Sequence, residues 1–146
     1  MIRTVVAMVA VAVAVTAVMA QGDPLSVRKN LMKQSNQHAK SLNSMVKGAT
    51  PFDGAAVTAA FNQWEEMAAK VPDLFPDNSK GGETRALPKI WETNADFRAK
   101  NAALAKAVAD HKGKAGSIEG LKAAMPAINA ACNDCHELYR GASKKK

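Results

Sequence analysis

Apolar residues recur at steps of three and four through four stretches of this chain, and proline or glycine separates the stretches. The first stretch follows Asp23, a good helix cap, and runs from Pro24 to Lys47 before Gly48. The second follows the turn at residues 50–53 and ends before Pro72. Each stretch has the period of an amphipathic helix, so the pattern predicts two helices in the first half of the chain.

A third helix is predicted to open at Pro88 and to end near His111, with Ile90, Trp91, Ala95, Phe97, Ala102, Leu104, Ala105 and Val108 on its buried side. A fourth follows Ser117 as its cap, and Pro126 should kink or interrupt it near Lys122. Residues 72–88 form a long irregular crossover. The chain is rich in alanine and poor in β-branched residues beyond its first twenty positions. We therefore expect an all-α, antiparallel four-helix bundle over residues 21–146.

Cys132, Cys135 and His136 form a C-x-x-C-H run in the fourth predicted helix. On a helix the two cysteines lie one turn apart on the same face. Both sulfurs can then reach the two vinyl groups of one porphyrin and form thioethers, with the histidine beside them and directed toward the iron. The run therefore predicts one covalently bound haem c near the C-terminal helix, with His136 as a metal ligand.

Other interpretations of the two cysteines are weaker. A thioredoxin-like C-x-x-C belongs in a parallel sheet, which this sequence does not predict. Structural zinc needs four ligands, and only His38 and His111 remain as further nitrogen donors, without a second cysteine pair. A plain disulfide between Cys132 and Cys135 stays open as the alternative to haem attachment.

Residues 1–20 combine Arg3, an apolar run from Val5 to Met19 and a small-residue end at Ala20. This pattern is typical of a secretory signal peptide cleaved after Ala20, which would leave no stable membrane insertion; an uncleaved anchor is the alternative. Covalent haem is attached outside the bacterial cytoplasm, so the leader and the C-x-x-C-H run support each other. We expect the mature protein in the periplasm.

The formal charge is +7, and since Arg3 is the only charged residue before Asp23, the chain after the leader keeps +6. The excess includes the closing tail at 144–146. Because no array of aromatic and basic residues is present, we expect no nucleic acid partner. The charge instead favours solubility and steering toward acidic partners.

Four features together resemble class II c-type cytochromes, the cytochrome c prime family. They are Arg28 before Leu31 and Met32, the loop at 81–85 that runs into residues 88–91, the C-x-x-C-H run at the C-terminal end, and Tyr139 and Arg140 after it. The resemblance implies thioethers at Cys132 and Cys135 and His136 as the proximal axial ligand. It places Arg140 beside the proximal face, Arg28 near a propionate and Trp91 as an aromatic side chain at the start of the third helix. By themselves, the residues predict Arg28 as a solvated charge and Met32 as core filler.

Met32 falls where the family has its distal residue. A methionine sulfur that coordinates the iron would make a low-spin electron carrier, which we expect to exchange electrons with redox partner proteins. A methionine held away would leave an open site for small gases such as nitric oxide or carbon monoxide. We expect no enzyme, because no other cluster of His, Asp, Glu or Cys is placed for acid-base or nucleophilic work. The resemblance also implies a homodimer through the first two helices as one option, since such dimers are common in the family, but the apolar stripes here do not separate an interface from the bundle interior.

Overall fold

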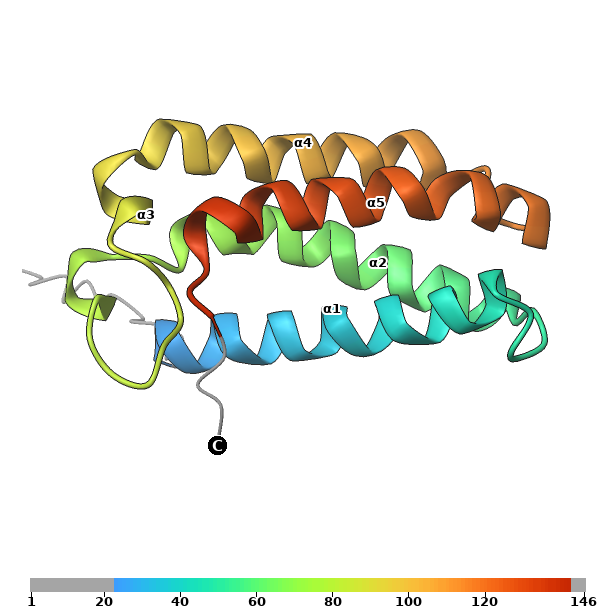
Figure 1. Ribbon diagram of the computed structural model, residues 1–146, viewed down its shortest axis with the longest axis horizontal. Helices are drawn as coiled ribbons and strands as arrows, with labels where there is room; N and C mark the ends of the chain where they lie inside the picture. Colours follow the sequence, from blue (N-terminus) through green and yellow to red (C-terminus); the bar gives the residue numbers. More distant parts are fainter. Residues whose placement is uncertain (1–22, 143–146) are drawn as a thin grey trace, which may run out of the picture.

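Four long helices lie side by side in the computed structural model, which describes residues 23–142 (Figure 1). They are α1 (Pro24–Val46), α2 (Gly54–Lys70), α4 (Asn94–Lys112) and α5 (Ile118–Tyr139), and successive helices run in opposite directions. Within the described residues there is no strand. The predicted all-α antiparallel four-helix bundle is confirmed. The predicted signal peptide and the lysine tail lie outside the described residues.

Side-chain caps fix the predicted helix starts. The Asp23 carboxylate accepts from the backbone N–H of Leu25 and Ser26, and Asp53 caps α2 in the same way. The Ser117 hydroxyl accepts from Gly120 N at the start of α5. Each cap satisfies N–H groups that the first helical turn leaves without a partner. Gly48 follows α1 with a φ of +72°, a conformation that glycine adopts most readily.

The predicted third helix is in fact two helices, α3 (Lys89–Glu92) and α4, separated at Thr93. Thr93 leaves helical geometry, with a φ of −122° and a ψ of 48°. Its hydroxyl donates to Lys89 O and lies 3.0 Å from the Tyr139 hydroxyl, while its backbone N also donates to Lys89 O, so side-chain contacts accompany the change of backbone direction. The buried side of α4 is also narrower than predicted, because Ala95, Ala102 and Ala105 are exposed.

The predicted interruption of the last helix at Pro126 is wrong, because α5 continues through it from Ile118 to Tyr139. Proline removes the N–H that would bond to Lys122 O. Both residues are exposed, so water can satisfy that carbonyl without ending the helix. A kink at this position stays a prediction.

The core lies where the four helices meet. Its largest fully buried side chains are Trp64, Phe61, Leu42, Leu121, Met125, Ile128 and Val108. The crossover between α2 and α3 is irregular apart from two short turns, η1 (Val71–Asp73) and η2 (Asp77–Ser79), as predicted. It ends against α5, since Leu87 N donates to Tyr139 O and Gly141 N to Arg85 O. Of the helices described, none is long and apolar enough to cross a membrane.

Candidate functional site

The two cysteines of the C-x-x-C-H run lie one turn apart on α5 and pack against the core as half-buried side chains. Both thiols are free, so the disulfide alternative is not what the structure shows. Burial raises the pKa of Cys132 and raises that of Cys135 to about 11. The motif therefore presents two protonated thiols at the edge of the core, within reach of one apolar group.

His136 is half-buried directly after the second cysteine. Burial, followed by the positive charges of Arg140 and Arg85, lowers the pKa of His136 to about 4. The imidazole is thus neutral at pH 7 and keeps the lone pair that a metal ligand needs. Arg85 is the member of this group that the sequence analysis missed, because it lies on the crossover and only the fold brings it near His136.

Within residues 23–142, no group of three or more His, Cys, Asp or Glu side chains could hold a metal ion. The available donors are therefore too few for a bare ion. They suit a metal that carries most of its own ligands, as the iron of a porphyrin does, and two thiols that can be alkylated suit its covalent attachment. The chemistry of the donor set fits haem c.

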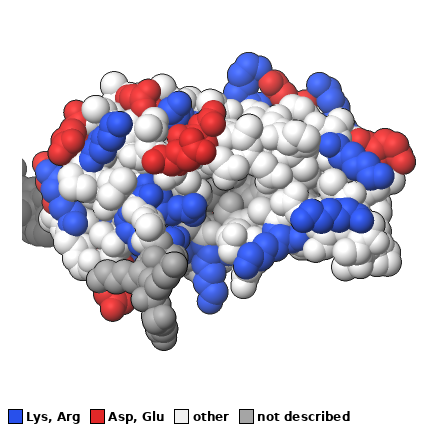
Figure 2. Space-filling model, viewed as in Figure 1, with Lys and Arg blue, Asp and Glu red and all other residues white. Residues whose placement is uncertain are grey.

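Met32 lies on the side of α1 that faces α5. The Asn129 amide donates to Asn43 Oδ1 at 3.2 Å, so Asn43 marks the side of α1 that faces α5, and Asn129 marks the side of α5 that faces α1. Met32 precedes Asn43 by about three helical turns, and His136 follows Asn129 by about two, so both share these facing sides. Met32 is half-buried and packs against the core. Figure 2 shows that the molecular surface is hollowed between these two helices.

Two polar atoms beside the first helix are buried without a hydrogen-bond partner in the described part of the chain. Gln63 donates from Nε2 to Leu31 O, the carbonyl before Met32, but its Oε1 has no partner. The ring nitrogen Nε1 of the next residue, Trp64, is also buried without a hydrogen-bond partner. Because unpaired buried polar atoms are rare in folded proteins, this part of the core has unused hydrogen-bonding capacity for a bound group.

Arg28 contradicts the prediction of a solvated charge, since only 3% of it is exposed. Its Nη1 donates to Leu74 O and to Ser79 Oγ, its Nη2 donates to Ser79 O, and the guanidinium lies 4.5 Å above the Phe75 ring. The reason is the crossover, which folds back over α1 and supplies these acceptors. Arg28 therefore anchors the crossover, while its predicted place near a propionate stays a prediction.

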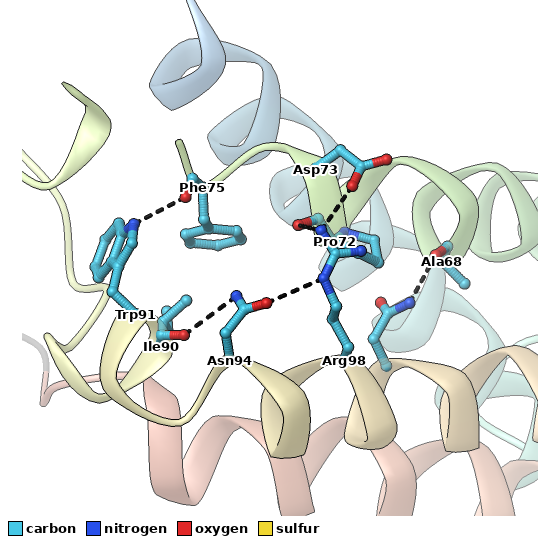
Figure 3. A network of polar contacts seen from close by, with 9 residues as sticks. Ala68, Pro72, Asp73, Phe75, Ile90, Trp91, Asn94 and Arg98 are labelled. Atoms are coloured by element: carbon cyan, nitrogen blue, oxygen red, sulfur yellow. Dashed lines mark hydrogen bonds and ion pairs between the residues drawn. The ribbon is translucent and has the colours of Figure 1, made fainter. Parts of the chain in front are cut away.

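Trp91 also contacts the crossover. Its Nε1 donates to Phe75 O at 2.8 Å, and the two rings meet edge to face (Figure 3). A second chain of contacts continues from α4, where Arg98 donates to Asn94 Oδ1 and pairs with Asp73. Trp91 thus belongs to the cluster that holds the crossover against α3 and α4, and its predicted contact with the haem stays untested.

The end of α5 carries the last two predicted features. Arg140 is exposed, and its backbone N donates to His136 O. Tyr139 is buried, and its hydroxyl donates to Asp96 Oδ2 at 2.5 Å. The aromatic ring and this charge-assisted bond connect the C-x-x-C-H helix to α4. Neither Asp96 nor Thr93 was predicted, because both partners of Tyr139 lie far from it in sequence.

Comparison with known proteins places these observations in a family. The family model of cytochrome c prime matches residues 23–140. Cytochrome c-556 of Rhodopseudomonas palustris is 41% identical over 145 residues, which cover 96% of this chain and 97% of the relative. Cytochrome c prime of the same organism is 38% identical over 122 residues, which cover 83% of this chain and 84% of the relative.

Solved structures agree with this assignment. The structure of cytochrome c prime from Rhodopseudomonas palustris superposes with a TM-score of 0.79 at 36% identity and covers 85% of this chain and 100% of that one. A nitric oxide complex of a cytochrome c prime variant from Alcaligenes xylosoxidans superposes with a TM-score of 0.71 at 26% identity. The match covers 82% of this chain and 94% of that one. Both relatives share the bundle and its order of helices. The chain therefore belongs to the cytochrome c prime family, whose members carry one haem c bound covalently to each chain.

Proposed function

We propose that this cytochrome is a one-electron carrier in which Cys132 and Cys135 bind the haem and His136 and Met32 are the two axial ligands. The observation that carries the proposal is the position of Met32. It is half-buried on the side of α1 that faces α5, where His136 lies on the facing side of α5 with a neutral imidazole. A thioether and a neutral imidazole on facing helices are the ligand pair of many electron-transfer cytochromes.

The residues of this chain have distinct tasks in that function. Cys132 and Cys135 tether the group to α5, and His136 stays unprotonated because it is buried beside two arginines. The haem, when bound, supplies an iron that accepts and releases one electron. Arg28 fixes the crossover to α1 one turn before Met32, so the backbone that carries the methionine is held in place. A rigid frame of this kind lowers the reorganisation that electron transfer requires.

We further propose that the mature protein works in the bacterial periplasm and does no substrate chemistry. The leader at residues 1–20 supports export, as does the need to attach haem c outside the cytoplasm. Apart from the C-x-x-C-H run, the sequence offers no motif of His, Asp, Glu or Cys placed for acid-base or nucleophilic work, which supports a carrier rather than an enzyme.

A second candidate function is the binding of small gases. It is favoured by the nitric oxide complex of the cytochrome c prime variant from Alcaligenes xylosoxidans, whose fold this chain shares. In that case Met32 would pack beside an open iron site without bonding to it. Methionine is flexible enough for both roles, because it has three rotatable side-chain bonds and a polarisable sulfur.

Optical absorption of the purified protein separates the two candidates. We expect sharp, split visible bands in the reduced protein that do not change when carbon monoxide is added. Met32→Leu should then give a high-spin spectrum that responds to the gas, because leucine has no sulfur to donate. A wild-type spectrum that is already high-spin and shifts with carbon monoxide would instead support gas binding. A protein without haem absorption would contradict both functions.

A further inference from the structure

Basic residues on α1 are not balanced by any acid on that helix. Residues 24–46 contain Arg28, Lys29, Lys33 and Lys40 but no Asp or Glu. Arg28 is buried, and the three lysines are exposed. Since Lys33 follows Lys29 by four residues and Lys40 follows Lys33 by seven, the three lysines form a row along one side of the helix.

This row borders the hollow between α1 and α5. Asn43 marks the side of α1 that faces α5, and Lys40 precedes it by about one turn and Lys29 by about four. On α5, Lys122 precedes Asn129 by about two turns and Arg140 follows it by about three. These five exposed cations, Lys29, Lys33, Lys40, Lys122 and Arg140, are called the basic rim below.

Of the acidic residues of α5, one faces α4 and two lie at the margin of the hollow. Asp134 lines a shallow pocket with Asp96, Lys100 and other residues of α4, so it faces away from α1. Glu119 and Glu137 are separated from Asn129 by 10 and 8 residues, which turns them about 80° from the side of α5 that faces α1, the same angle by which Lys33 is turned from the side of α1 marked by Asn43. Five cations and two acids therefore border the hollow, and the edge formed by α1 carries positive charge alone (Figure 2).

The ion pairs within residues 23–142 lie outside α1 and α5. The pairs in the described residues are Lys70–Glu66, Lys80–Asp77, Arg98–Asp73, Lys106–Asp110 and Lys112–Glu65. All of them lie on α2, α4 or the crossover, and none involves a residue of the basic rim. The cations of the basic rim thus have no ion-pair partner among the described residues where the cysteines, His136 and Met32 meet the surface.

We propose that the basic rim is the docking surface for an acidic electron-transfer protein, an inference that rests on the proposed carrier function. The row from Lys29 to Lys40 extends about 16 Å along the helix. That length suits a protein surface better than a single small anion. Unpaired lysines around a hollow attract an acidic partner over distances of about 8 Å at physiological salt and orient it toward the enclosed group.

The test measures how fast reduced flavodoxin, an acidic one-electron donor, reduces the oxidised holoprotein in a stopped-flow instrument. Flavodoxin is oxidised by one electron and the cytochrome is reduced by one, so the exchange is balanced. The triple variant K29Q/K33Q/K40Q removes three charges from the basic rim. The matched control K70Q/K106Q/K112Q removes three charges from lysines that are already ion-paired outside α1 and α5. A neutral small-molecule reductant measures electron uptake without docking.

We expect the rim variant to lose about tenfold in second-order rate at low salt and the control less than about twofold, with both differences vanishing near 0.5 M salt. Equal slowing of both variants would overturn the proposal, because net charge alone would explain it. A changed absorption spectrum or a changed rate with the neutral reductant in the rim variant would also overturn it, since the lysines would then serve the haem itself. If even the wild type fails to cycle with the neutral reductant, the carrier function fails instead.

Discussion

Arg28 on α1 donates to both the side-chain and the backbone oxygen of Ser79, at 2.8 and 2.9 Å, across 51 positions of sequence. The residue thus joins the first helix to the middle of the crossover. The hydrogen bonds of this guanidinium to Leu74, Ser79 and Thr84 all go to neutral oxygens, and the face of Phe75 and the more distant charge of Asp23 add to them. A buried cation held in this way needs every one of these contacts.

We predict that Arg28→Met lowers the free energy of unfolding by at least about 2 kcal/mol, because the crossover carbonyls lose a charged donor. Amide hydrogen exchange should quicken in residues 74–84 more than in the four long helices. Arg28→Lys should have a free energy of unfolding between those of the wild type and Arg28→Met, since an ammonium cannot reach all the acceptors. Lys29→Met, an exposed neighbour, is the control and should change stability by less than about 0.5 kcal/mol. Unchanged exchange in the crossover would contradict the anchoring role.

Gly120 is the second test, because a Cβ there would lie 1.9 Å from Lys114 O. The first turn of α5 therefore packs directly on the backbone that follows α4. We predict that Gly120→Ala lowers the free energy of unfolding by at least about 1 kcal/mol, since the backbone must move to make room for the methyl group. Gly113→Ala is the matched control, because no atom lies within 4 Å of its Cβ position. Urea unfolding of both variants makes the comparison, and equal stabilities would refute the close approach.

The Tyr139 hydroxyl is the third test. It donates to Asp96 and contacts Thr93, and its ring is buried. Tyr139→Phe keeps the ring but leaves the carboxylate without this donor, so we predict a loss of about 1–3 kcal/mol in urea unfolding. Asp96→Asn retains an oxygen acceptor for the Tyr139 hydroxyl and should lose less unfolding free energy than Tyr139→Phe. A phenylalanine variant as stable as the wild type would show that water replaces the bond.

The pKa of His136 gives a pH prediction. Because it falls from an ordinary 6.5 to about 4, the folded state binds fewer protons than the unfolded state between these values. The free energy of unfolding should therefore fall as pH falls through this range, while the neutral ligand form persists until pH approaches 4. Urea unfolding of the protein before haem attachment, followed from about pH 7 to about pH 4, measures this loss.

Arg140→Gln provides the check on that prediction. Burial is the main cause of the lowered pKa, and the charge of Arg140 is the next. Removing this charge should raise the pKa of His136 and move the acid loss of stability to higher pH. Lys122→Gln removes a charge from the same side of α5, about five turns from Arg140, and should leave the pH of this loss of stability unchanged. A shift of equal size in both variants would point to net charge rather than to the neighbour of His136.

Sequence periodicity predicted most of the fold because helix boundaries are set locally. Asp23, Asp53 and Ser117 cap helices as expected, and each cap acts on N–H groups within three residues. The break at Thr93 was not predictable in this way. It depends on contacts with Tyr139, which lies 46 residues later, and no local pattern contains that information.

The residues of the candidate site were likewise predictable only where a local sequence pattern identifies them. The C-x-x-C-H run has a fixed local spacing, so Cys132, Cys135 and His136 could be identified from the sequence alone. Arg28 could not be placed, because the burial of a charged side chain depends on acceptors that another part of the chain supplies. Arg85 was missed for the same reason, since its effect on His136 appears only after the crossover has folded against α5.

The pairing of α1 with α5 has a consequence for how the protein is made. Asn43 and Asn129 lie 86 positions apart, so this contact closes the longest loop among the side-chain hydrogen bonds described. During synthesis α5 emerges after the helices against which it packs. Its thiols therefore remain accessible to the attachment machinery until α5 docks, which allows haem attachment to precede closure of the bundle.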